Sequence, residues 1–461
     1  MDMTPTFTPI PAIRPASPGH QFVCYADACS GVAGGLHEST FSRVNRVVSR
    51  LSPAPEFICF PGDEIIGLTA NKASLREQWR HWFEQEMGWL DEATRFYHTT
   101  GNHTVYDSMS EAVFRETMAH LPRNGPSDQL GLCYFVRRGD LLMVFVNTLW
   151  SGLGGEGRLE STWLADTLEA HSDVRYKMVF GHHPVFPVNG FAGSYQRHLD
   201  PENGRRFWDI LEKHGVLAYW CSHILAFDVQ VHGGVLQITT GGAGTAHRMP
   251  EEIEYLHCVQ AALDNTGLRY QVLDDVGTIR EWLQWPMPVP DYQFQSLGAS
   301  VHPPPPADPT CTAVYHFQIQ GQTTTVEQAG PPQTLFSGHA NTGELSTIWA
   351  GLSGVPQTLT IWMREENGRS PHLWIGPRLA DNAPFSLELA LHSGMGPGGL
   401  LWRWHETSPW NSLVGASAWG LGKVKWPRTW TVGQGQHGSG DRPFLGNDLT
   451  ILWRHQLLRL A

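Results

Sequence analysis

Five short segments place polar side chains directly after apolar runs that have the length and composition of buried β-strands. The polar side chains stand in Gly, Ser or Pro turns, where strands usually end. In layered α/β domains ligands bind beyond the carboxyl ends of strands, so we expect these side chains to meet at one rim. Asp, Asn and His together form a ligand set for borderline divalent metals. The segments are "YADAC" with Asp27, "FPGDE" with Asp63, "TTGNH" with Asn102 and His103, "FGHHP" with His182 and His183, and "WCSHI" with His223.

The alternation of apolar runs with helical patterns predicts an α/β domain with a mixed sheet or a pair of sheets. Apolar positions at helical spacing predict helices over 37–51, 73–90, 108–121, 155–171 and 204–216. A hairpin with its turn at Gly139 and Asp140 is expected over 133–148. Further strands are expected over 21–27, 56–63, 95–103, 176–183, 217–223, 226–242 and 268–275.

The tract "SVHPPPPADPT" at 300–310 divides the chain, because four consecutive prolines favour a stiff extended spacer. Beyond it, short alternating runs between turn residues predict an all-β sandwich or jelly roll. We therefore expect four parts: a Pro-rich extension over 1–20, an α/β domain over 21–295, a linker over 296–310 and a β-sandwich over 311–461.

The bulk composition excludes several classes of protein. Of the 461 residues, 41% are hydrophobic and 16% charged, which is typical of a globular protein. The formal net charge of -12 argues against a nucleic-acid surface. No apolar run approaches the roughly 20 residues needed to span a bilayer, and the N-terminus lacks the pattern of a signal peptide. Seven scattered cysteines favour a reducing compartment, so a cytoplasmic location is expected.

The order Asp, Gly-Asp, Gly-Asn-His, Gly-His and Ser-His resembles the calcineurin-like metallophosphoesterase superfamily, and within it the purple-acid-phosphatase-like branch. The segment "VFGHHPVF" is similar to that branch's Gly-His-x-Pro turn. "YWCSHILAFDVQVHGGVLQITTGGAG" is similar to its late Cys-Gly-His segment. The resemblance covers about residues 21–250 and implies a four-layer αββα core.

The resemblance also implies roles for particular residues. One metal would be held by Asp63, Asn102, His182 and His223. Asp63 would bridge to a second metal. His103 would lie near the leaving group, as a proton donor or as a positive partner for the phosphoryl oxygens. Gly101 is expected to let the backbone turn sharply enough to present both Asn102 and His103.

The second metal site departs from the family pattern. The first motif reads Asp27-Ala28-Cys29 where the family has Asp-x-His, and Ile66 stands where the purple branch has Tyr. The last motif ends in Leu225, which cannot bind a metal. This site keeps Asp27 and Asp63, and Cys29 either contributes a thiolate or is a small buried residue. We expect one firmly bound divalent or trivalent metal (Fe, Mn or Zn) and an altered second site.

The predicted function is hydrolysis of a small-molecule phosphate mono- or diester by a metal-activated water, with His103 as the catalytic side chain. Substrate contacts are expected from His183, Tyr106, His247 and Arg248, although Arg248 reads equally well as a surface arginine. Two alternatives share the fold: an enzyme with a different metal-dependent reaction, and a non-catalytic binding protein. Retention of His103 favours an enzyme, whereas the lost ligands favour the alternatives.

The C-terminal domain carries a cluster of tryptophans that either fill a sandwich core or stack on sugars. Its end, "WTVGQGQHGSGDRPFLGNDLTILWRHQL", resembles the closing strands of laminin-G or concanavalin-like sandwiches. A structural cap, a homo-oligomer interface and a glycan-binding module all stay open for this domain. The tryptophans are Trp402, Trp404, Trp410, Trp419, Trp426, Trp430 and Trp453.

Overall fold

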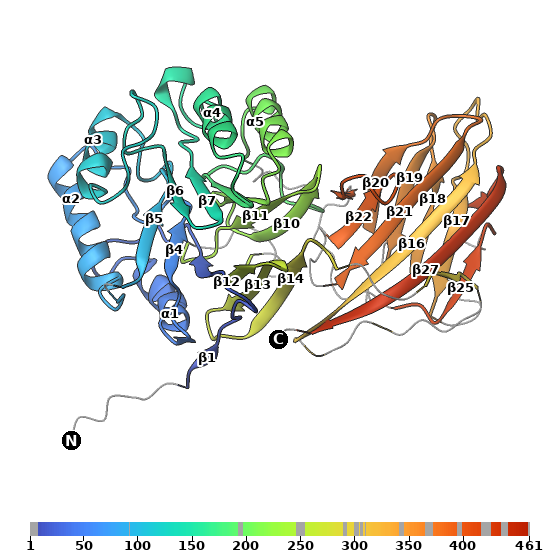
Figure 1. The fold of residues 1–461 in the computed structure, drawn as a ribbon, viewed down its shortest axis with the longest axis horizontal. Helices are drawn as coiled ribbons and strands as arrows, with labels where there is room; N and C mark the ends of the chain where they lie inside the picture. Colours follow the sequence, from blue (N-terminus) through green and yellow to red (C-terminus); the bar gives the residue numbers. More distant parts are fainter. Residues whose placement is uncertain are drawn as a thin grey trace.

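The computed structural model has an α/β part and a strand-rich part, which lie side by side (Figure 1). It describes residues 8–91, 93–191, 197–245, 254–288, 293–298, 304, 308, 310–340, 345–364, 372–393, 399–415, 426–434 and 441–459. Among these residues, none of the helices combines the length and the apolar character that crossing a bilayer requires.

Two six-stranded sheets form the centre of the α/β part. The first has the order β14-β13-β12-β2-β4-β5 and the second the order β10-β11-β9-β8-β7-β6. The first comprises β2 (His20–Cys24), β4 (Phe57–Phe60), β5 (Arg95–His98), β12 (His257–Asp264), β13 (Gly267–Asp274) and β14 (Ile279–Trp285). The second comprises β6 (Tyr134–Arg138), β7 (Leu141–Phe145), β8 (Tyr176–Phe180), β9 (Ala218–Cys221), β10 (Phe227–His232) and β11 (Val235–Thr240).

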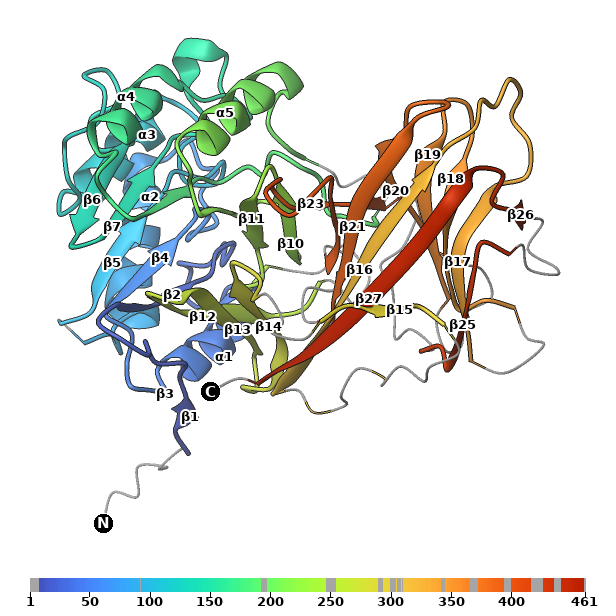
Figure 2. The same ribbon diagram turned by 45° about the vertical axis from the view of Figure 1, so that its right-hand side comes forward.

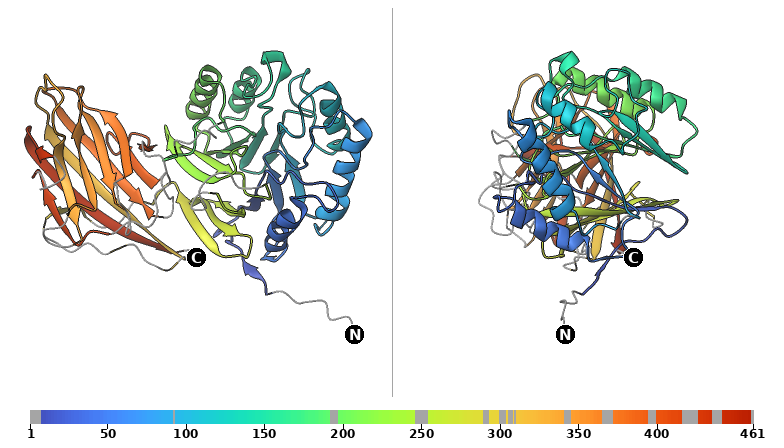
Figure 3. Two further views of the ribbon diagram at one scale, coloured as in Figure 1. Left: turned by 180° about the vertical axis from the view of Figure 1, so that it is seen from behind. Right: turned by 90° about the vertical axis from the view of Figure 1, so that its left-hand side faces the viewer.

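Helices cover the outer faces of these sheets, so the part has four layers (Figure 3). Side chains of α1 (Glu38–Val48), α2 (Lys72–His81) and α3 (Ser108–Thr117) belong to the central apolar core. The same core contains side chains from both sheets, which pack against each other. Side chains of α4 (Thr162–Ala170) and α5 (Pro201–Lys213) form a second core against β7, β8 and β9. The predicted α/β class is therefore confirmed.

The differences from the predicted elements have local physical causes. The helix predicted over 73–90 ends as α2 at His81 and continues as a π-turn, η1 (Trp82–Glu86). The helix predicted over 155–171 begins only at Thr162, because Glu160 accepts hydrogen bonds from the backbone N–H groups of Thr162 and Trp163. Within the Pro-rich extension, β1 (Ile10–Pro11) pairs with β3 (Leu51–Ser52).

The C-terminal part consists of two packed sheets, seen from a second side in Figure 2, which agrees with an all-β domain. One sheet has β15 (Gln295–Ser296), β27 (Asn447–Arg459), β16 (Cys311–Gln322), β21 (Pro384–His392), β22 (Leu400–Arg403) and β23 (Asn411–Ser412). The other has β24 (Val414–Gly415), β20 (His372–Arg378), β19 (Thr358–Met363), β18 (Ile348–Ser353), β17 (Gln333–His339), β25 (Thr429–Val432) and β26 (Arg442–Pro443). Because β15 pairs with β27, a strand that precedes the Pro-rich tract already belongs to this part.

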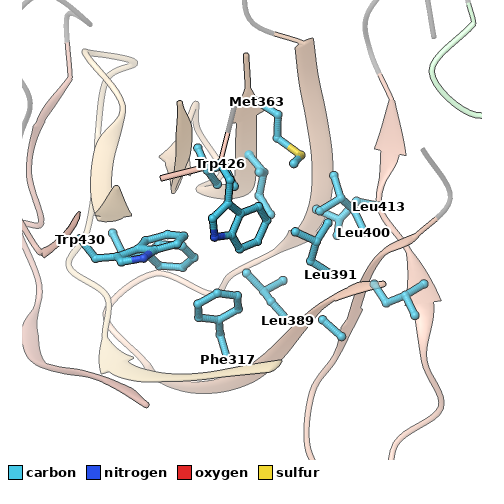
Figure 4. A pocket seen from close by; sticks show the side chains of 13 residues that line it. Phe317, Met363, Leu389, Leu391, Leu400, Leu413, Trp426 and Trp430 are labelled. Atoms are coloured by element: carbon cyan, nitrogen blue, oxygen red, sulfur yellow. The ribbon is translucent and has the colours of Figure 1, made fainter. Parts of the chain in front are cut away.

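Most of the tryptophans in this part fill apolar space. Trp430 and Trp453 are buried between the sheets, and Trp402 and Trp426 pack partly buried against the same core. Figure 4 shows Trp426 and Trp430 beside an apolar cavity that Phe317 also lines. Such packing is the usual role of tryptophan in a sandwich. Trp410 packs against the core of the α/β part, Trp404 is exposed, and Trp419 lies outside the described residues.

The two parts meet along β10. The backbone N–H of Val231 donates to Ser412 Oγ (2.9 Å), and that of Gly233 donates to Asn411 Oδ1 (2.7 Å). Asn189 donates to the carbonyl of Leu413 (2.9 Å) and accepts from the N–H of Gly415 (2.7 Å). In the ribbon, β6, α2 and α3 lie at the side of the α/β part that is remote from the sandwich (Figure 2).

A buried ion cluster makes the sandwich sensitive to acid. Burial raises the pKa of Glu388, but His316 and Arg403 (Nε to Oε2, 2.6 Å) lower it more, from 4.5 to about 2. Because the folded pKa lies below the unfolded one, this stabilisation is present above pH 4.5 and is lost as the pH falls toward 2. Between pH 5 and pH 3, urea denaturation should show wild type losing about 2 kcal/mol more unfolding free energy than Glu388→Gln. Equal losses would contradict this role.

Candidate metal centre

The two sheets bring the predicted polar segments together at one rim. Strands β2, β4 and β5 are parallel neighbours in the first sheet, and β8 and β9 are parallel neighbours in the second. Hydrogen bonds then join the strand ends across the sheets. Asp27 Oδ2 accepts the backbone N–H of His223 (2.9 Å), and the ring Nδ1 of His182 donates to the carbonyl of Pro61 (2.8 Å).

The backbone at this rim adopts conformations that L-residues rarely take. Asp27, Asp63 and His223 have φ values of 61°, 60° and 65°, and such left-handed residues gather at functional sites. Gly62 has φ 92°. Gly101 is needed for another reason than the turn predicted from the sequence. A Cβ there would lie 2.2 Å from Asp63 Oδ1, so the glycine lets the two loops approach.

Four of the predicted ligands converge on one point. Asn102 Oδ1 lies 2.9 Å from His182 Nε2 and 2.9 Å from His223 Nδ1. The two ring nitrogens are 3.1 Å apart, and Asp63 Oδ2 is 3.3 Å from His182 Nε2. All four side chains are buried or half-buried. The structure thus places Asp63, Asn102, His182 and His223 as a single cluster.

The chemistry of this donor set fits a cation. A carbonyl can only accept, so the Nδ1 of His182 carries a proton, and its Nε2 in the neutral ring points a lone pair at other acceptors. Burial lowers the pKa of His182, but the carboxylate of Asp63 outweighs burial and raises that pKa to about 9. Burial raises the pKa of Asp63. The charge of His182 and the hydrogen bond from the His103 N–H lower this pKa by more than burial raises it, so the net shift is downward. The cluster therefore attracts positive charge at the point where its acceptors meet.

Asp27 and Cys29 lie next to Asp63: the backbone N–H of Cys29 donates to the carbonyl of Asp63 (2.8 Å), and that of Asp27 donates to the carbonyl of Gly62 (3.3 Å). Burial raises the pKa of Asp27 to about 7. The Cys29 thiol lies within 4.8 Å of ligand atoms of Asp63 and His103, and burial raises its pKa. Ile66, at the position of the purple branch's Tyr, is 41% exposed, and Leu225 is buried. This part of the rim thus has two carboxylates, a thiol and a ring nitrogen of His103, but neither Ile66 nor Leu225 can bind a metal.

His103 is oriented beside the cluster without joining it. Its backbone N–H donates to Asp63 Oδ1 (2.9 Å), and its ring Nδ1 donates to the carbonyl of Ile66 (2.8 Å). Nδ1 is therefore occupied as a donor, which leaves Nε2 to exchange a proton with a substrate. The half-buried ring is reachable from solvent.

The predicted substrate contacts have different outcomes. Tyr106 lines a surface pocket beside Asn102, and its hydroxyl donates to the carbonyl of Thr69 (2.8 Å). His183 is buried, and its Nε2 faces Glu156 Oε1 at 3.5 Å. His247 and Arg248 lie outside the described residues.

Sequence reasoning missed Glu156, Glu64 and His98. Glu156 comes from a Gly-rich loop without a strand before it, so no local pattern marks it. Glu64 follows Asp63 directly, and its Oε1 lies 2.7 Å from His98 Nδ1, both side chains being fully buried. Burial raises the pKa of Glu64 and lowers that of His98, so the pair is neutral. The adjacency of Glu64 to Asp63 was the available signal.

Comparison with known proteins agrees with this architecture. Residues 24–227 match the family model of the calcineurin-like phosphoesterases, so this segment of the chain is similar to that family. No curated protein sequence matches the chain.

Three of the solved structures that match part of the chain do so with the following identity, coverage and TM-score. A purple acid phosphatase from yellow lupin (Lupinus luteus) seeds is 12% identical, with 58% of this chain and 53% of that chain covered and a TM-score of 0.45. A dimetal phosphatase from Danio rerio is 15% identical over 56% and 96% of the two chains, with a TM-score of 0.37. The inner membrane complex anchor of Plasmodium is 14% identical over 57% and 88%, with a TM-score of 0.39.

Proposed function

We propose that this protein is a metal-dependent phosphoesterase that hydrolyses a small-molecule phosphate mono- or diester. The observation that carries the proposal is the convergence of Asp63, Asn102, His182 and His223 on one point inside a calcineurin-like phosphoesterase domain. These four residues hold one Fe, Mn or Zn ion, and the site with Asp27 and Cys29 is altered.

When bound, the cation would supply electrostatic stabilisation of the phosphoryl oxygens and would lower the pKa of a water molecule. The chain's own residues do the remaining work. The Asp63 carboxylate and the His182 ring set the net charge of the site, because they lie 3.3 Å apart and both are buried. Tyr106 and Asn102 border the pocket through which a phosphate ester reaches the cluster. His103 gives a proton from Nε2 to the leaving oxygen.

Replacing His103 with alanine should separate catalysis from metal binding. We expect kcat for an aryl phosphate to fall by about 10²–10⁴, the range for general acid–base groups, with unchanged metal content. The loss should be larger for an alkyl phosphate than for p-nitrophenyl phosphate, because a poor leaving group needs the proton more. Steady-state kinetics on the two substrates, with elemental analysis of the same samples, checks this. An equal loss on both substrates would remove the proton-donor role.

The function itself is tested by assaying the purified chain with p-nitrophenyl phosphate and bis(p-nitrophenyl) phosphate after loading with Mn²⁺, Zn²⁺ or Fe²⁺. Turnover that a chelator abolishes and added metal restores is the expected result. A chain that binds one metal without releasing phosphate would instead be an enzyme of another kind. A chain that binds none would be a binding protein.

For the remainder of the chain we propose that residues 311–461, together with the preceding strand β15, form a laminin-G-like sandwich, and that the Pro-rich tract after β15 is the linker. The two packed sheets and the tryptophan-rich core support a structural role for this domain. The contacts along β10 support a cap on the phosphoesterase domain over 21–295.

A further inference from the structure

A second group of ligand atoms lies beside the first cluster and is absent from the family pattern described above. It consists of a carboxylate oxygen of Glu156 and a ring nitrogen each of His183 and His223, all within 4.8 Å of one another. We infer that this group is a second binding site for a borderline divalent cation such as Zn²⁺ or Co²⁺, displaced from the altered site at Asp27 and Cys29. The site shares His223 with the first cluster.

The distances suit a cation better than direct hydrogen bonds. Glu156 Oε1 lies 3.5 Å from His183 Nε2 and 3.8 Å from His223 Nε2. Ligands bound at 2.0–2.1 Å around a tetrahedral Zn²⁺ are separated by roughly 3.4 Å. The His183 Nε2 is buried, and apart from its 3.5 Å ion-pair contact with Glu156 it makes no hydrogen bond among the described residues. A buried imidazole nitrogen left in this state is costly unless something binds it.

His183 is held in the orientation that a ligand needs. Its Nδ1 lies 2.9 Å from Thr148 Oγ1, which can accept the ring N–H, and its carbonyl accepts the hydroxyl of Tyr219 (2.6 Å). Metal-binding histidines usually donate their second ring N–H in this way, which fixes the tautomer. The lone pair of His183 Nε2 is thereby directed toward Glu156. Sequence reasoning assigned His183 to the substrate, and the geometry points to a cation instead.

His223 connects the two clusters through its opposite ring nitrogens. Its Nδ1 lies 2.9 Å from Asn102 Oδ1, and its Nε2 faces Glu156 at 3.8 Å. One neutral imidazole offers one lone pair. If both clusters were filled at once, His223 would have to bridge them as an imidazolate, with its Nε2 proton passing to solvent.

The loop that carries Glu156 leaves the site open to solvent, since this side chain is 50% exposed. Arg197 is its other partner, with Nη1 3.6 Å from Glu156 Oε1. The guanidinium is 59% exposed and competes with a cation for the same oxygen. Removal of this competitor should thus strengthen binding of the second cation.

Isothermal titration calorimetry of the metal-free chain with Zn²⁺ tests the inference. We expect two cations per wild-type chain. Glu156→Gln and His183→Gln should each bind one cation tightly, with the second weakened by more than about 100-fold, beyond the cost of losing an outer partner. Arg197→Gln should bind the second cation more tightly than wild type. Circular dichroism checks that the variants are folded. Because Glu156 is half-exposed and His183 is buried, Glu156→Gln is the variant less prone to unfold.

Two control variants locate the second cation. Glu169→Gln removes a carboxylate that faces a single histidine, His214, at a comparable 3.6 Å, and should keep two cations. Cys29→Ala should also keep two. A wild-type chain that binds one cation would overturn this inference and leave the proposed function in place. If Glu156→Gln still bound two cations, the second ion would lie elsewhere and the inference would be wrong. The inference would also be wrong if Cys29→Ala bound only one cation.

Discussion

Asp63→Ala is expected to lose the bound metal and at least about 10³-fold of the phosphoesterase activity, because this carboxylate supplies the negative charge of the first cluster. Asp63 Oδ2 faces His182 Nε2, and Asp63 Oδ1 accepts the backbone N–H of His103. Its loss therefore removes a metal ligand and releases the loop that orients His103. Elemental analysis after desalting and an aryl-phosphate assay on the same sample measure both effects.

A surface aspartate provides the matched control for this substitution. Asp173 pairs with Arg137 on the surface, and its side chain is 62% exposed. Asp173→Ala should retain both the metal and the activity. If Asp63→Ala kept a full complement of metal, the assignment of the first cluster would be wrong. Equal loss in both variants would point to general damage instead.

Glu64→Ala is expected to destabilise the metal-free chain by about 3 kcal/mol. The substitution leaves His98 Nδ1 buried without its partner and opens a cavity under the Asp63 loop. Glu64→Gln should cost only about 1 kcal/mol, since an uncharged amide can replace one member of a neutral pair. Urea denaturation of the two variants and wild type gives both values.

The comparison between these two variants shows the charge state of the pair. If Glu64 and His98 were both charged, Glu64→Gln would leave a buried imidazolium without a counter-charge. The unfolding free energy would then fall as much in Glu64→Gln as in Glu64→Ala. Equal losses would therefore contradict the neutral pair. Glu77→Ala breaks a surface ion pair with Arg80 and serves as a control, with an expected change below about 0.5 kcal/mol.

The α/β core could be predicted from the sequence because its signals are local. Each polar segment follows an apolar run, and the runs became β2, β4, β5, β8 and β9. The hairpin at Gly139 was predicted from its turn residues and is confirmed by the pairing of β6 with β7. The β12 strand was not predicted, because its place is set by pairing with β2, more than 200 residues away in the sequence.

The limits of prediction at the site have the same origin. Asn102 and His103 stand in a recognisable turn, whereas Glu156 stands in a loop whose position depends on the fold of the whole domain. The partner of Glu64, His98, is brought to it by the parallel pairing of β4 with β5. The direction in which His183 Nε2 points depends on Thr148 and Tyr219, which no spacing rule connects to it.

The central claim is that the acceptors of Asp63, Asn102, His182 and His223 hold a cation. The most direct measurement is a crystal structure of the Zn²⁺-loaded chain, with anomalous diffraction recorded on both sides of the zinc absorption edge. The account predicts an anomalous peak among these four side chains, at about 2.0–2.2 Å from the nitrogen and oxygen ligands. An ordered cluster without a peak there would contradict it.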